Sequence, residues 1–460
     1  MNTTAAIATP NATRQRERYQ VAIVGLGVTG LSCARYCRRR GWSYFIADTR
    51  AEPPLLPRLR AEDADAEVVT GTLPVDRLAR AERIVLTPGL PLDLPELAVA
   101  RAAGVPVVGD IELFLETARA PVIAVTGANG KSTVTTLVAA LLAADGRRVR
   151  AGGNLAPAAL DLIEADEPDY YVLELSSFQL ERTPAMRSAA ATLLNVSPDH
   201  LDRHGDLDRY AAIKRRVYRA TGCAVLNRDD RRASQPLPDA PERRWFTLQA
   251  PRSEYDYAVV PRSDGPWLAR AGEPLLPVAS MRLAGRHNAA NALAACALVD
   301  GSVTAETMRR VLREFPGLPH RCQWVARVGG VDYYDDSKAT NIGAAAAAIQ
   351  GLYAERSGVV IAGGQGKGAD FAEFGALLAK HLRAVVLLGE DASLIQRALP
   401  PGFPAPIVAD MPAAVAAAAS LARPSDVIAL APACASLDMF SNYAARGAAF
   451  AAAVHALEGR

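Results

Sequence analysis

The sequence predicts an α/β protein of three domains built on parallel sheets. Its 460 residues, half of them apolar, are enough for two or three separate cores. Short apolar strand patterns alternate with helical patterns along most of the chain, which is typical of doubly wound parallel sheets. Two glycine-rich turns of the nucleotide-binding kind, at residues 25–30 and 126–133, each lie between a predicted strand and a predicted helix.

The first block opens with the turn GLGVTG at residues 25–30, and Asp48 ends the next predicted strand. By itself this pattern is a dinucleotide fingerprint, and its alternative is a tight strand–helix turn without a ligand. The surrounding pattern predicts a helix at 30–40 and strands at 20–24, 43–47, 83–86 and 105–108.

The second turn, TGANGKST at 126–133, follows a predicted strand at 122–125 and precedes a helix at 134–144. This layout favours a phosphate-binding loop, in which Lys131 reaches the β- and γ-phosphates and Ser132 or Thr133 holds Mg²⁺. The spacing departs from the usual loop, because Val125 stands where a glycine is common. A plain turn is the alternative.

Three polar residues of the middle block have both a functional and a structural interpretation. Glu174 ends a predicted strand at 170–175 and either holds Mg²⁺ or is simply solvated. His200 follows a strand at 191–196, and Lys214 lies on the next helix, where a solvated charge is the plain alternative. Residues 231–262 are rich in Pro and Arg and predict an irregular loop-and-hairpin insertion.

The last block begins after the Pro- and Gly-rich residues 315–319 and predicts strands at 331–335, 358–362, 384–388 and 427–430. Arg321, Asp336 and Lys338 lie at its start, and fixed cations of this kind suit a migrating phosphoryl group. Just before the block, Asn288 and Asn291 open a helix at 289–298, where they either contact adenine or cap the helix.

Composition excludes several classes of partner. With 51 basic and 49 acidic residues, the charge gives no argument for nucleic acid, and no apolar run is long enough for membrane insertion. Residues 1–18 lack an apolar signal core and predict a disordered tail. The six cysteines are scattered, which favours free thiols in the cytoplasm over a metal site. We expect a monomer, although sequence does not give the oligomeric state.

Ten segments together closely resemble the Mur ligase family, and within it the member that adds glutamate. They are GDIELF, TGANGKSTVTTL, GGN, YVLELSSFQLE, LNVSPDHLDR, GRHNAANALAA, GLPHR, DDSKATN, GGQGKGADF and PACASLDMF. The resemblance runs from about residue 19 to the C-terminus. It implies a Rossmann-like UDP-sugar-binding domain (19–110), a central P-loop ATP-binding mononucleotide fold (111–317) and a Rossmann-like C-terminal amino-acid-binding domain (318–460).

The resemblance also implies a role for each matching residue. The residues implied for the UDP substrate are Val28, Thr29, Thr49, Arg50, Thr87, Pro88, Gly89, Asn154, Ser176 and Gln179. Those implied for ATP are Gly127, Asn129, Gly130, Lys131, Ser132, Thr133, Asn288, Asn291, Arg321, Asp336 and Lys338. Those implied for D-glutamate are Thr340, Lys367, Ser436, Leu437 and Tyr443. The metal ligands would be Ser132, Glu174, His200 and a carbamylated Lys214, and the catalytic set Lys131, Glu174, His200, Lys214 and Lys338.

The implied reaction is the ATP-dependent addition of D-glutamate to UDP-N-acetylmuramoyl-L-alanine in peptidoglycan precursor synthesis, with ATP and Mg²⁺ as cofactors. ATP would convert the carboxylate to an acyl phosphate, which the glutamate amine then attacks. The amine must be neutral, and the sequence does not single out its base. Gln365 and Tyr443 depart from the family pattern, where Asp and Phe are common, and put details of the amino-acid pocket in doubt.

Three other functions remain open at this point. A folylpolyglutamate synthase uses the same chemistry, but we would not expect it to carry the GLGVTG domain. Another Mur ligase is nearer, and the DDSKATN and PACASLDMF segments favour the glutamate-adding member. A dinucleotide-dependent dehydrogenase or a non-catalytic nucleotide sensor would use residues 25–30, but would not explain Lys131, Glu174 and Lys338 together.

Overall fold

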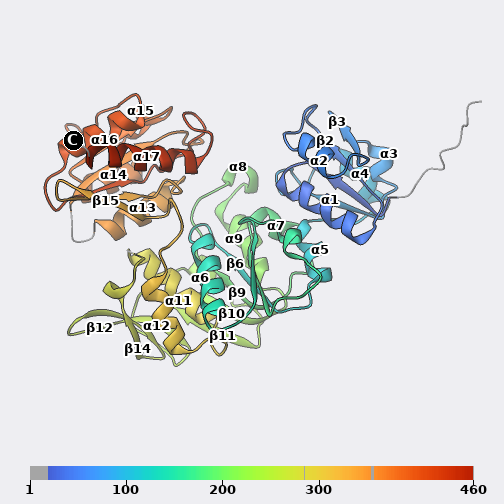
Figure 1. Cartoon of the computed structure of the whole chain (residues 1–460), viewed down its shortest axis with the longest axis horizontal. Helices are drawn as coiled ribbons and strands as arrows, with labels where there is room; N and C mark the ends of the chain where they lie inside the picture. The colour runs from blue at the N-terminus through green and yellow to red at the C-terminus, as the bar shows by residue number, and fades with distance from the viewer. Residues whose placement is uncertain (1–18, 284, 354–356, 459–460) are drawn as a thin grey trace, which may run out of the picture. The chain divides into compact units, whose positions relative to one another are not determined.

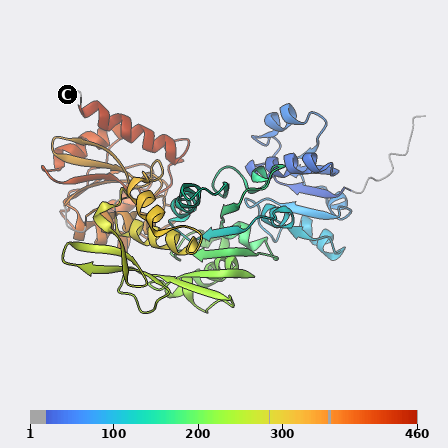
Figure 2. The same cartoon turned by 60° about the horizontal axis from the view of Figure 1, so that its bottom comes forward.

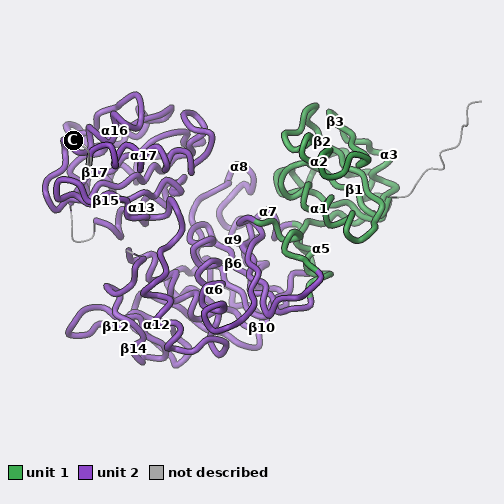
Figure 3. Tube along the Cα trace, viewed as in Figure 1, with its two compact units in different colours: residues 1–118, 157–164, 182–184 green, residues 119–156, 165–181, 185–460 purple. Residues whose placement is uncertain are grey.

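The computed structural model describes residues 19–283, 285–353 and 357–458, which form two compact units (Figure 3). Unit 1 comprises the described residues up to Ala118 together with Pro157–Glu164 and Arg182–Pro184, and unit 2 comprises the others. The predicted α/β class with three sheets is confirmed. The predicted tail at 1–18 lies outside the described residues. None of the described helices is both long and apolar enough for a membrane span.

Unit 1 is a parallel five-stranded sheet in the order β3-β2-β1-β4-β5 (Figure 1). Its strands are β1 Val21–Val24, β2 Tyr44–Asp48, β3 Glu67–Thr70, β4 Arg83–Leu86 and β5 Val107–Val108. Its helices are α1 Val28–Arg40, α2 Leu56–Glu62, α3 Val75–Leu78, α4 Glu96–Ala102, α5 Asp110–Thr117 and the 3₁₀ turn η1 Ala159–Leu162. The short strand β3 was not predicted, because only two of its four residues are apolar.

The turn between β1 and α1 requires its glycines. Gly25 has a φ of 101°, and a Cβ there would lie 2.1 Å from the hydroxyl of Thr87. A Cβ on Gly30 would lie 2.0 Å from the carbonyl oxygen of Gly25. Only glycine allows this approach of helix to strand, so the pattern at 25–30 is explained by packing before any ligand is considered.

Unit 2 contains a nine-stranded sheet in the order β14-β13-β12-β11-β10-β9-β6-β8-β7. Its strands are β6 Val122–Thr126, β7 Val149–Gly153, β8 Tyr170–Glu174, β9 Ser188–Leu193, β10 Thr221–Asn227, β11 Glu242–Phe246, β12 Asp256–Arg262, β13 Gly265–Arg270 and β14 Glu273–Pro277. Its helices are α6 Lys131–Ala144, α7 Ser177–Glu181, α8 Leu201–His204, α9 Leu207–Arg215, α10 Arg231–Ser234, α11 Arg286–Leu298 and α12 Ala305–Glu314, with 3₁₀ turns η2 Arg216–Tyr218 and η3 Val278–Ser280.

The prediction of a loop-and-hairpin insertion at 231–262 is confirmed for the hairpin, which begins at β12, but is wrong for the region before it, where β11 is a regular strand. β11 and β12 extend the sheet in parallel with β10, and antiparallel hairpins appear only from β12 to β14 (Figure 2). The sequence obscured β11 because its first residues, Glu242 and Arg243, are exposed and charged. Pairing with β10 supplies the backbone partners that make this polar segment a strand.

The third sheet, also in unit 2, has the order β15-β16-β19-β17-β18, with β16, β19, β17 and β18 parallel. Its strands are β15 Gln323–Val328, β16 Val331–Asp335, β17 Gly358–Gly363, β18 Ala384–Leu388 and β19 Val427–Leu430. Its helices are α13 Ile342–Leu352, α14 Ala372–His381, α15 Ala392–Arg397, α16 Met411–Leu421 and α17 Tyr443–Glu458. The buried strand β19 therefore has a parallel strand on each side, and the carboxyl ends of all three meet at one edge.

Candidate active site

The loop after β6 leads directly into α6, as predicted for a phosphate-binding loop. Gly130 caps α6 with a φ of 83°, and a Cβ there would lie 2.4 Å from Oδ1 of Asn291. The loop is fixed on its other side by Asn195, whose Oδ1 accepts a hydrogen bond from the N–H of Asn129 at 2.8 Å. The first N–H groups of a helix attract anions, so the start of α6 suits a phosphate group.

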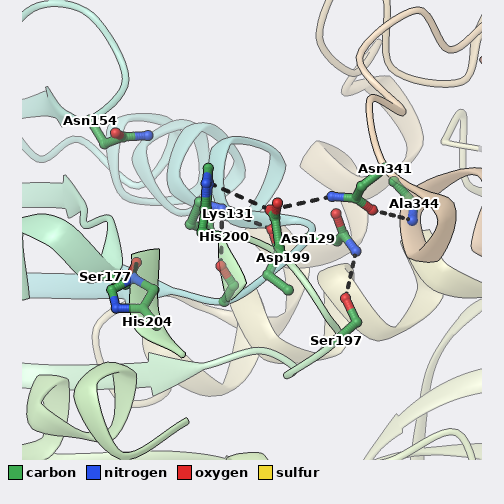
Figure 4. Close-up of polar contacts among 12 residues, drawn as sticks. Asn129, Lys131, Asn154, Ser177, Ser197, Asp199, His200, His204, Asn341 and Ala344 are labelled. Atoms are coloured by element: carbon green, nitrogen blue, oxygen red, sulfur yellow. Dashed lines mark hydrogen bonds and ion pairs between the residues drawn. The ribbon is translucent and has the colours of Figure 1, made fainter. Parts of the chain in front are cut away.

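Lys131 folds back over this loop. Its Nζ donates to the carbonyl oxygens of Gly127 and Ala128, each at 2.9 Å (Figure 4). Burial lowers the pKa of Lys131, and the negative charge of Glu174 partly opposes that shift. A phosphate would therefore meet a cation that is already held at the loop.

Glu174 lies at the carboxyl end of β8 with only 2% of its surface exposed, so it is not a solvated strand end. Its Oε1 accepts a hydrogen bond from Nδ2 of Asn154 at 2.6 Å. Its Oε2 is buried without a partner among the described residues. A buried carboxylate oxygen of this kind needs a ligand, because desolvating it without a partner is costly.

These donors fit Mg²⁺. The part of the chain that the structure describes has no group of three or more His, Cys, Asp or Glu that could enclose a metal. Mg²⁺ does not need such a cage, since it usually keeps waters and binds one or two carboxylates together with substrate phosphates. Oε2 of Glu174 and the hydroxyl of Ser132 are the oxygens available to it beside the loop. The Ser132 hydroxyl accepts a hydrogen bond from Nη2 of Arg321 at 2.9 Å.

Lys214 lies on α9 and is 2% exposed, which overturns its interpretation as a solvated helix charge. Its Nζ donates to the carbonyl oxygen of Gly127 at 2.8 Å and lies 4.8 Å from the ring centroid of Tyr210. Burial, reinforced by the positive charge of Lys131, lowers the pKa of Lys214 well below its usual value. Burial therefore favours the neutral, nucleophilic form of this amine over the charged form.

His200 caps α8 in a left-handed conformation with a φ of 54°. Its Nε2 lies 3.7 Å from Oδ2 of Asp199, and its ring meets the ring of Phe178 edge-on at 5.0 Å. The same oxygen of Asp199 accepts a hydrogen bond from Nδ2 of Asn341 at 3.4 Å (Figure 4). The His200 loop thus contacts the segment that precedes α13.

A cavity of about 340 Å³ lies in unit 2 beside the phosphate-binding loop. Its lining includes eight of the predicted ATP residues, namely Asn129, Gly130, Thr133, Asn288, Asn291, Arg321, Asp336 and Lys338. The alternative that the two asparagines cap α11 is wrong, because Gly285 is the capping residue. Nδ2 of Asn291 instead donates to Oδ1 of Asn288 at 3.1 Å, and both side chains are buried.

Two titratable groups of this cavity have shifted pKa values. Burial raises the pKa of Asp336 to about 7, although the nearby Arg321 partly opposes the shift. Burial, together with the charge of Arg321, lowers the pKa of Lys338 to about 8. Perturbed groups at one cavity are characteristic of functional sites.

The residues predicted for D-glutamate lie at the carboxyl edge of the third sheet. Lys367 is exposed on the turn after β17, and the buried Ser436 lies on the turn after β19. These two turns are joined through paired backbone bonds between Gln365 and Ala435. Tyr443 begins α17, and its ring lies 3.8 Å from Nζ of Lys338, so the predicted ATP and glutamate groups adjoin there. Of the remaining members, Thr340 is partly exposed and Leu437 is exposed.

The residues predicted for the UDP substrate are divided between the units. In unit 1, Val28, Thr29, Thr49, Arg50, Pro88 and Gly89 are at least partly exposed at the carboxyl edge of the sheet, and Thr87 is buried. In unit 2, Asn154 contacts Glu174, and Oε1 of Gln179 accepts bonds from the N–H and hydroxyl of Ser176 at 3.1 and 3.2 Å.

Asp48 is already occupied by its own chain. Its carboxylate accepts hydrogen bonds from the N–H of Leu26 at 2.7 Å and from the guanidinium of Arg50 at 2.7 and 2.9 Å. Burial raises the pKa of Asp48, but these bonds outweigh burial and lower it to about 2. A dinucleotide-binding site needs this acid for a ribose, so the structure disfavours the dehydrogenase alternative.

Sequence reasoning missed two buried polar groups near these residues. His204 donates to or accepts from the hydroxyl of Ser177 across 3.0 Å, beneath the segment that follows Glu174. Arg446 is 2% exposed on α17 and contacts the ends of three strands of the third sheet. A single arginine within the Ala-rich helix after Tyr443 was the available signal.

The chain matches three family models in sequence order. These are "Mur ligase MurD-like, N-terminal domain" at residues 19–109, "Mur ligase middle domain" at 125–299 and "Mur ligase, glutamate ligase domain" at 320–434. It is 49% identical to the UDP-N-acetylmuramoylalanine–D-glutamate ligase of Nitrosococcus oceani over 94% of this chain and 95% of that one. The identity to the enzyme of the same name from Pseudomonas aeruginosa is 47%, over 95% and 97% of the two chains.

Solved structures show the same fold at low identity. UDP-N-acetylmuramate-alanine ligase MurC from Thermotoga maritima superposes with a TM-score of 0.60 at 20% identity, covering 95% of this chain and all of that one. MurF from Acinetobacter baumannii gives a TM-score of 0.54 at 17% identity, covering 91% of this chain and 88% of that one. The three-domain α/β architecture is thus shared with the solved structures of MurC and MurF.

Proposed function

We infer the function from one premise, which is that this chain belongs to the Mur ligase family. The protein is an ATP-dependent ligase that adds D-glutamate to UDP-N-acetylmuramoyl-L-alanine, in peptidoglycan precursor synthesis. The observation that carries this conclusion is 44–49% identity to D-glutamate ligases over nearly the whole chain. The cluster of Lys131, Glu174 and Lys214 around one phosphate-type loop supports it independently.

The chemistry follows from the fact that a carboxylate oxygen is a poor leaving group, so the carboxylate must be activated before an amine can displace that oxygen. Transfer of the γ-phosphoryl group of ATP to the L-alanyl carboxylate gives an acyl phosphate and ADP. The neutral amine of D-glutamate then attacks the carbonyl carbon, and inorganic phosphate leaves with the electrons of the broken C–O bond. The nitrogen gives up one proton to a base as the amide forms. Lys131 and Lys338 would hold the phosphoryl oxygens, whose charge is greatest during transfer. Mg²⁺, when bound, would neutralise the phosphates, and Glu174, Ser132, His200 and a carbamylated Lys214 would hold it.

Each of the three substrates is assigned to the segment of the chain that contains one of the three sheets. We assign UDP-sugar binding to residues 19–110, ATP binding to 111–317 and D-glutamate binding to 318–460. Within these segments, the cavity with Asn288, Asn291 and Asp336 would take the adenosine, and the turns with Lys367 and Ser436 would take the amino acid. The six cysteines are free and buried, which suits the reducing cytoplasm where such precursors are made.

Phosphate release tests the function directly. Purified protein with ATP and Mg²⁺ should release phosphate only when both UDP-N-acetylmuramoyl-L-alanine and D-glutamate are present. Six reactions separate the alternatives: each substrate alone, both together, the UDP substrate with L-glutamate, the UDP substrate with another amino acid, and folate with L-glutamate. Release with folate and L-glutamate, or with the UDP substrate and a different amino acid, would overturn the assignment.

Replacing Lys367 with alanine should raise the D-glutamate KM about ten- to over a hundredfold. The reason is that a charge-assisted hydrogen bond to a carboxylate contributes roughly 1.5–3 kcal/mol. The KM values for ATP and for the UDP substrate should stay nearly unchanged. The exposed Lys380 on α14 provides the matched control. If the ATP KM rises while that of D-glutamate does not, Lys367 belongs to the nucleotide site.

The kcat/KM for ATP should follow a bell-shaped pH profile with limbs near pH 7 and pH 8. Below about pH 7 the carboxyl of Asp336 is protonated and loses acceptor capacity for the ribose hydroxyls. Above about pH 8 the amine of Lys338 loses its proton and its attraction for phosphate. Asp336→Asn should remove the acid limb and keep the alkaline one. An acid limb that persists in this variant would assign that limb to another group.

A further inference from the structure

Arg446 is one of the most deeply buried side chains of the protein. It lies in the first turns of α17 with 2% of its surface exposed, on a helix whose other residues are mainly alanine. It forms no ion pair with a carboxylate in the part of the chain that the structure describes. Burial lowers the pKa of Arg446 to about 10, so its guanidinium stays charged at neutral pH. The negative charges of Asp438 and Asp335 partly oppose that shift, but neither forms an ion pair with the guanidinium among the described residues. A buried charge that lacks a direct ion pair is costly and calls for a functional explanation.

The guanidinium donates almost entirely to backbone carbonyl oxygens. Nη2 donates to the carbonyls of Ser337 and Cys434 at 2.8 and 3.1 Å, and Nη1 to those of Cys434 and Ala435 at 3.1 and 3.3 Å. A longer contact of 3.5 Å reaches the carbonyl of Gly363, and Nε donates to the hydroxyl of Ser337 at 3.0 Å. The side chain of Arg446 therefore links the carboxyl ends of β16, β17 and β19 and the segments that follow them.

These anchor points lie one to four residues before the residues assigned to substrates. Ser337 precedes Lys338, Ala435 precedes Ser436, and the strand that ends at Gly363 leads to Lys367. The Ser337 hydroxyl in turn donates to the carbonyl of Tyr443 at 2.7 Å, which closes the network onto the start of α17.

The bond to Ala435 also fixes the direction of a donor. In a trans peptide the C=O and the following N–H point in opposite directions. Because the Ala435 carbonyl faces the guanidinium, the N–H of Ser436 faces away from it. Neither Ser436 nor Leu437 has a backbone N–H bonded to any described residue. Ser436 directly precedes the turn at residues 437–439, and successive free N–H groups in a turn suit a carboxylate.

We propose that Arg446 is a positioning residue for the amino-acid site, which orients the N–H groups of Ser436 and Leu437 toward a substrate carboxylate and places a fixed positive charge behind them. This role rests on the proposed function, in which that carboxylate belongs to D-glutamate. The charge acts at short range through a dry interior, where screening is weak. Arg446 touches no substrate itself.

Two substitutions separate the charge from the geometry. Arg446→Lys keeps a cation but loses the planar fan of donors, and Arg446→Met keeps the length and loses both. We expect the D-glutamate KM to rise about tenfold in the Lys variant and about a hundredfold in the Met variant, as for one and two strong contacts. The ATP KM should stay within about threefold, and Arg397→Lys on the exposed end of α15 serves as the matched control.

A pH profile tests the charge even if the Met variant does not fold. A buried lysine loses its proton far more readily than arginine. In Arg446→Lys the ratio of variant to wild-type D-glutamate KM should therefore rise between about pH 7 and pH 9, because deprotonation removes the charge that attracts the carboxylate. A purely structural role would leave this ratio flat while lowering the melting temperature.

The possible results distinguish a failure of the role of Arg446 from a failure of the proposed function. Parallel rises in the ATP and D-glutamate KM values, a flat pH ratio, or an unchanged D-glutamate KM in a destabilised variant would each overturn the role of Arg446. A wild-type protein that releases no phosphate with D-glutamate would instead overturn the proposed function. A variant Ser337→Ala, which removes one anchor only, should raise the D-glutamate KM by a few fold.

Discussion

Replacing Lys131 with alanine should reduce ligation by about 10²- to 10³-fold or more. Lys131 is held over the phosphate-binding loop by the carbonyls of Gly127 and Ala128, so its charge is in place before the phosphoryl group moves. Removing one preorganised group that stabilises developing charge typically has an effect of this size. The measurement is the initial rate of phosphate release with all three substrates at saturation.

The folded state should be little affected by this substitution. Burial already lowers the pKa of Lys131, which means that the protein environment disfavours its charge. Circular dichroism and the melting temperature should therefore match those of wild type, as should those of the control Lys380→Ala. Ligation at a near wild-type rate in a folded Lys131→Ala protein would refute its assignment to the phosphates.

Replacing Lys214 with alanine should slow ligation by about a hundredfold or more, because it removes a carbamate that would itself hold the metal, and losing even a partner of a metal ligand has an effect approaching this size. The proposed active form is a carbamate, made when the neutral amine attacks CO₂, an N–C bond forms and one proton leaves. Burial and the positive charge of Lys131 lower the pKa of Lys214, which favours the neutral amine that this step requires. Wild-type protein equilibrated with ¹³C-bicarbonate should show one carbamate resonance that Lys214→Ala lacks.

Chemical rescue distinguishes this role from simple packing. Formate or acetate entering the space left by Lys214→Ala should restore part of the activity, because each supplies a carboxylate where the carbamate stood. The same salts should not rescue Lys131→Ala, whose missing group is a cation. If neither the resonance nor the rescue is observed, Lys214 acts as an unmodified amine, bonded to the carbonyl of Gly127 as in the present structure.

Local patterns were sufficient for much of the fold and for the phosphate-binding loop. The predicted strands at 83–86, 331–335, 384–388 and 427–430 match the observed bounds. Three of them are mostly apolar, as buried parallel strands are, whereas 331–335 alternates buried and half-buried residues. The turns at 25–30 and 126–133 could also be predicted from their glycines, since a tight strand–helix turn requires glycine locally. Ten short segments were enough to indicate the family.

The sequence by itself thus determined which chemical groups this protein has and that they follow strands. Only the tertiary structure decided which of them are buried. Lys214, Arg446 and the pair Asn288 and Asn291 all lie on helices whose patterns fit a solvated face or a cap, and the structure buries each of them. Likewise, the segment of β11 is a strand because it pairs with β10. The physical reason is that burial, and every pKa shift that comes with it, depends on contacts between segments far apart in the chain, which no local pattern records.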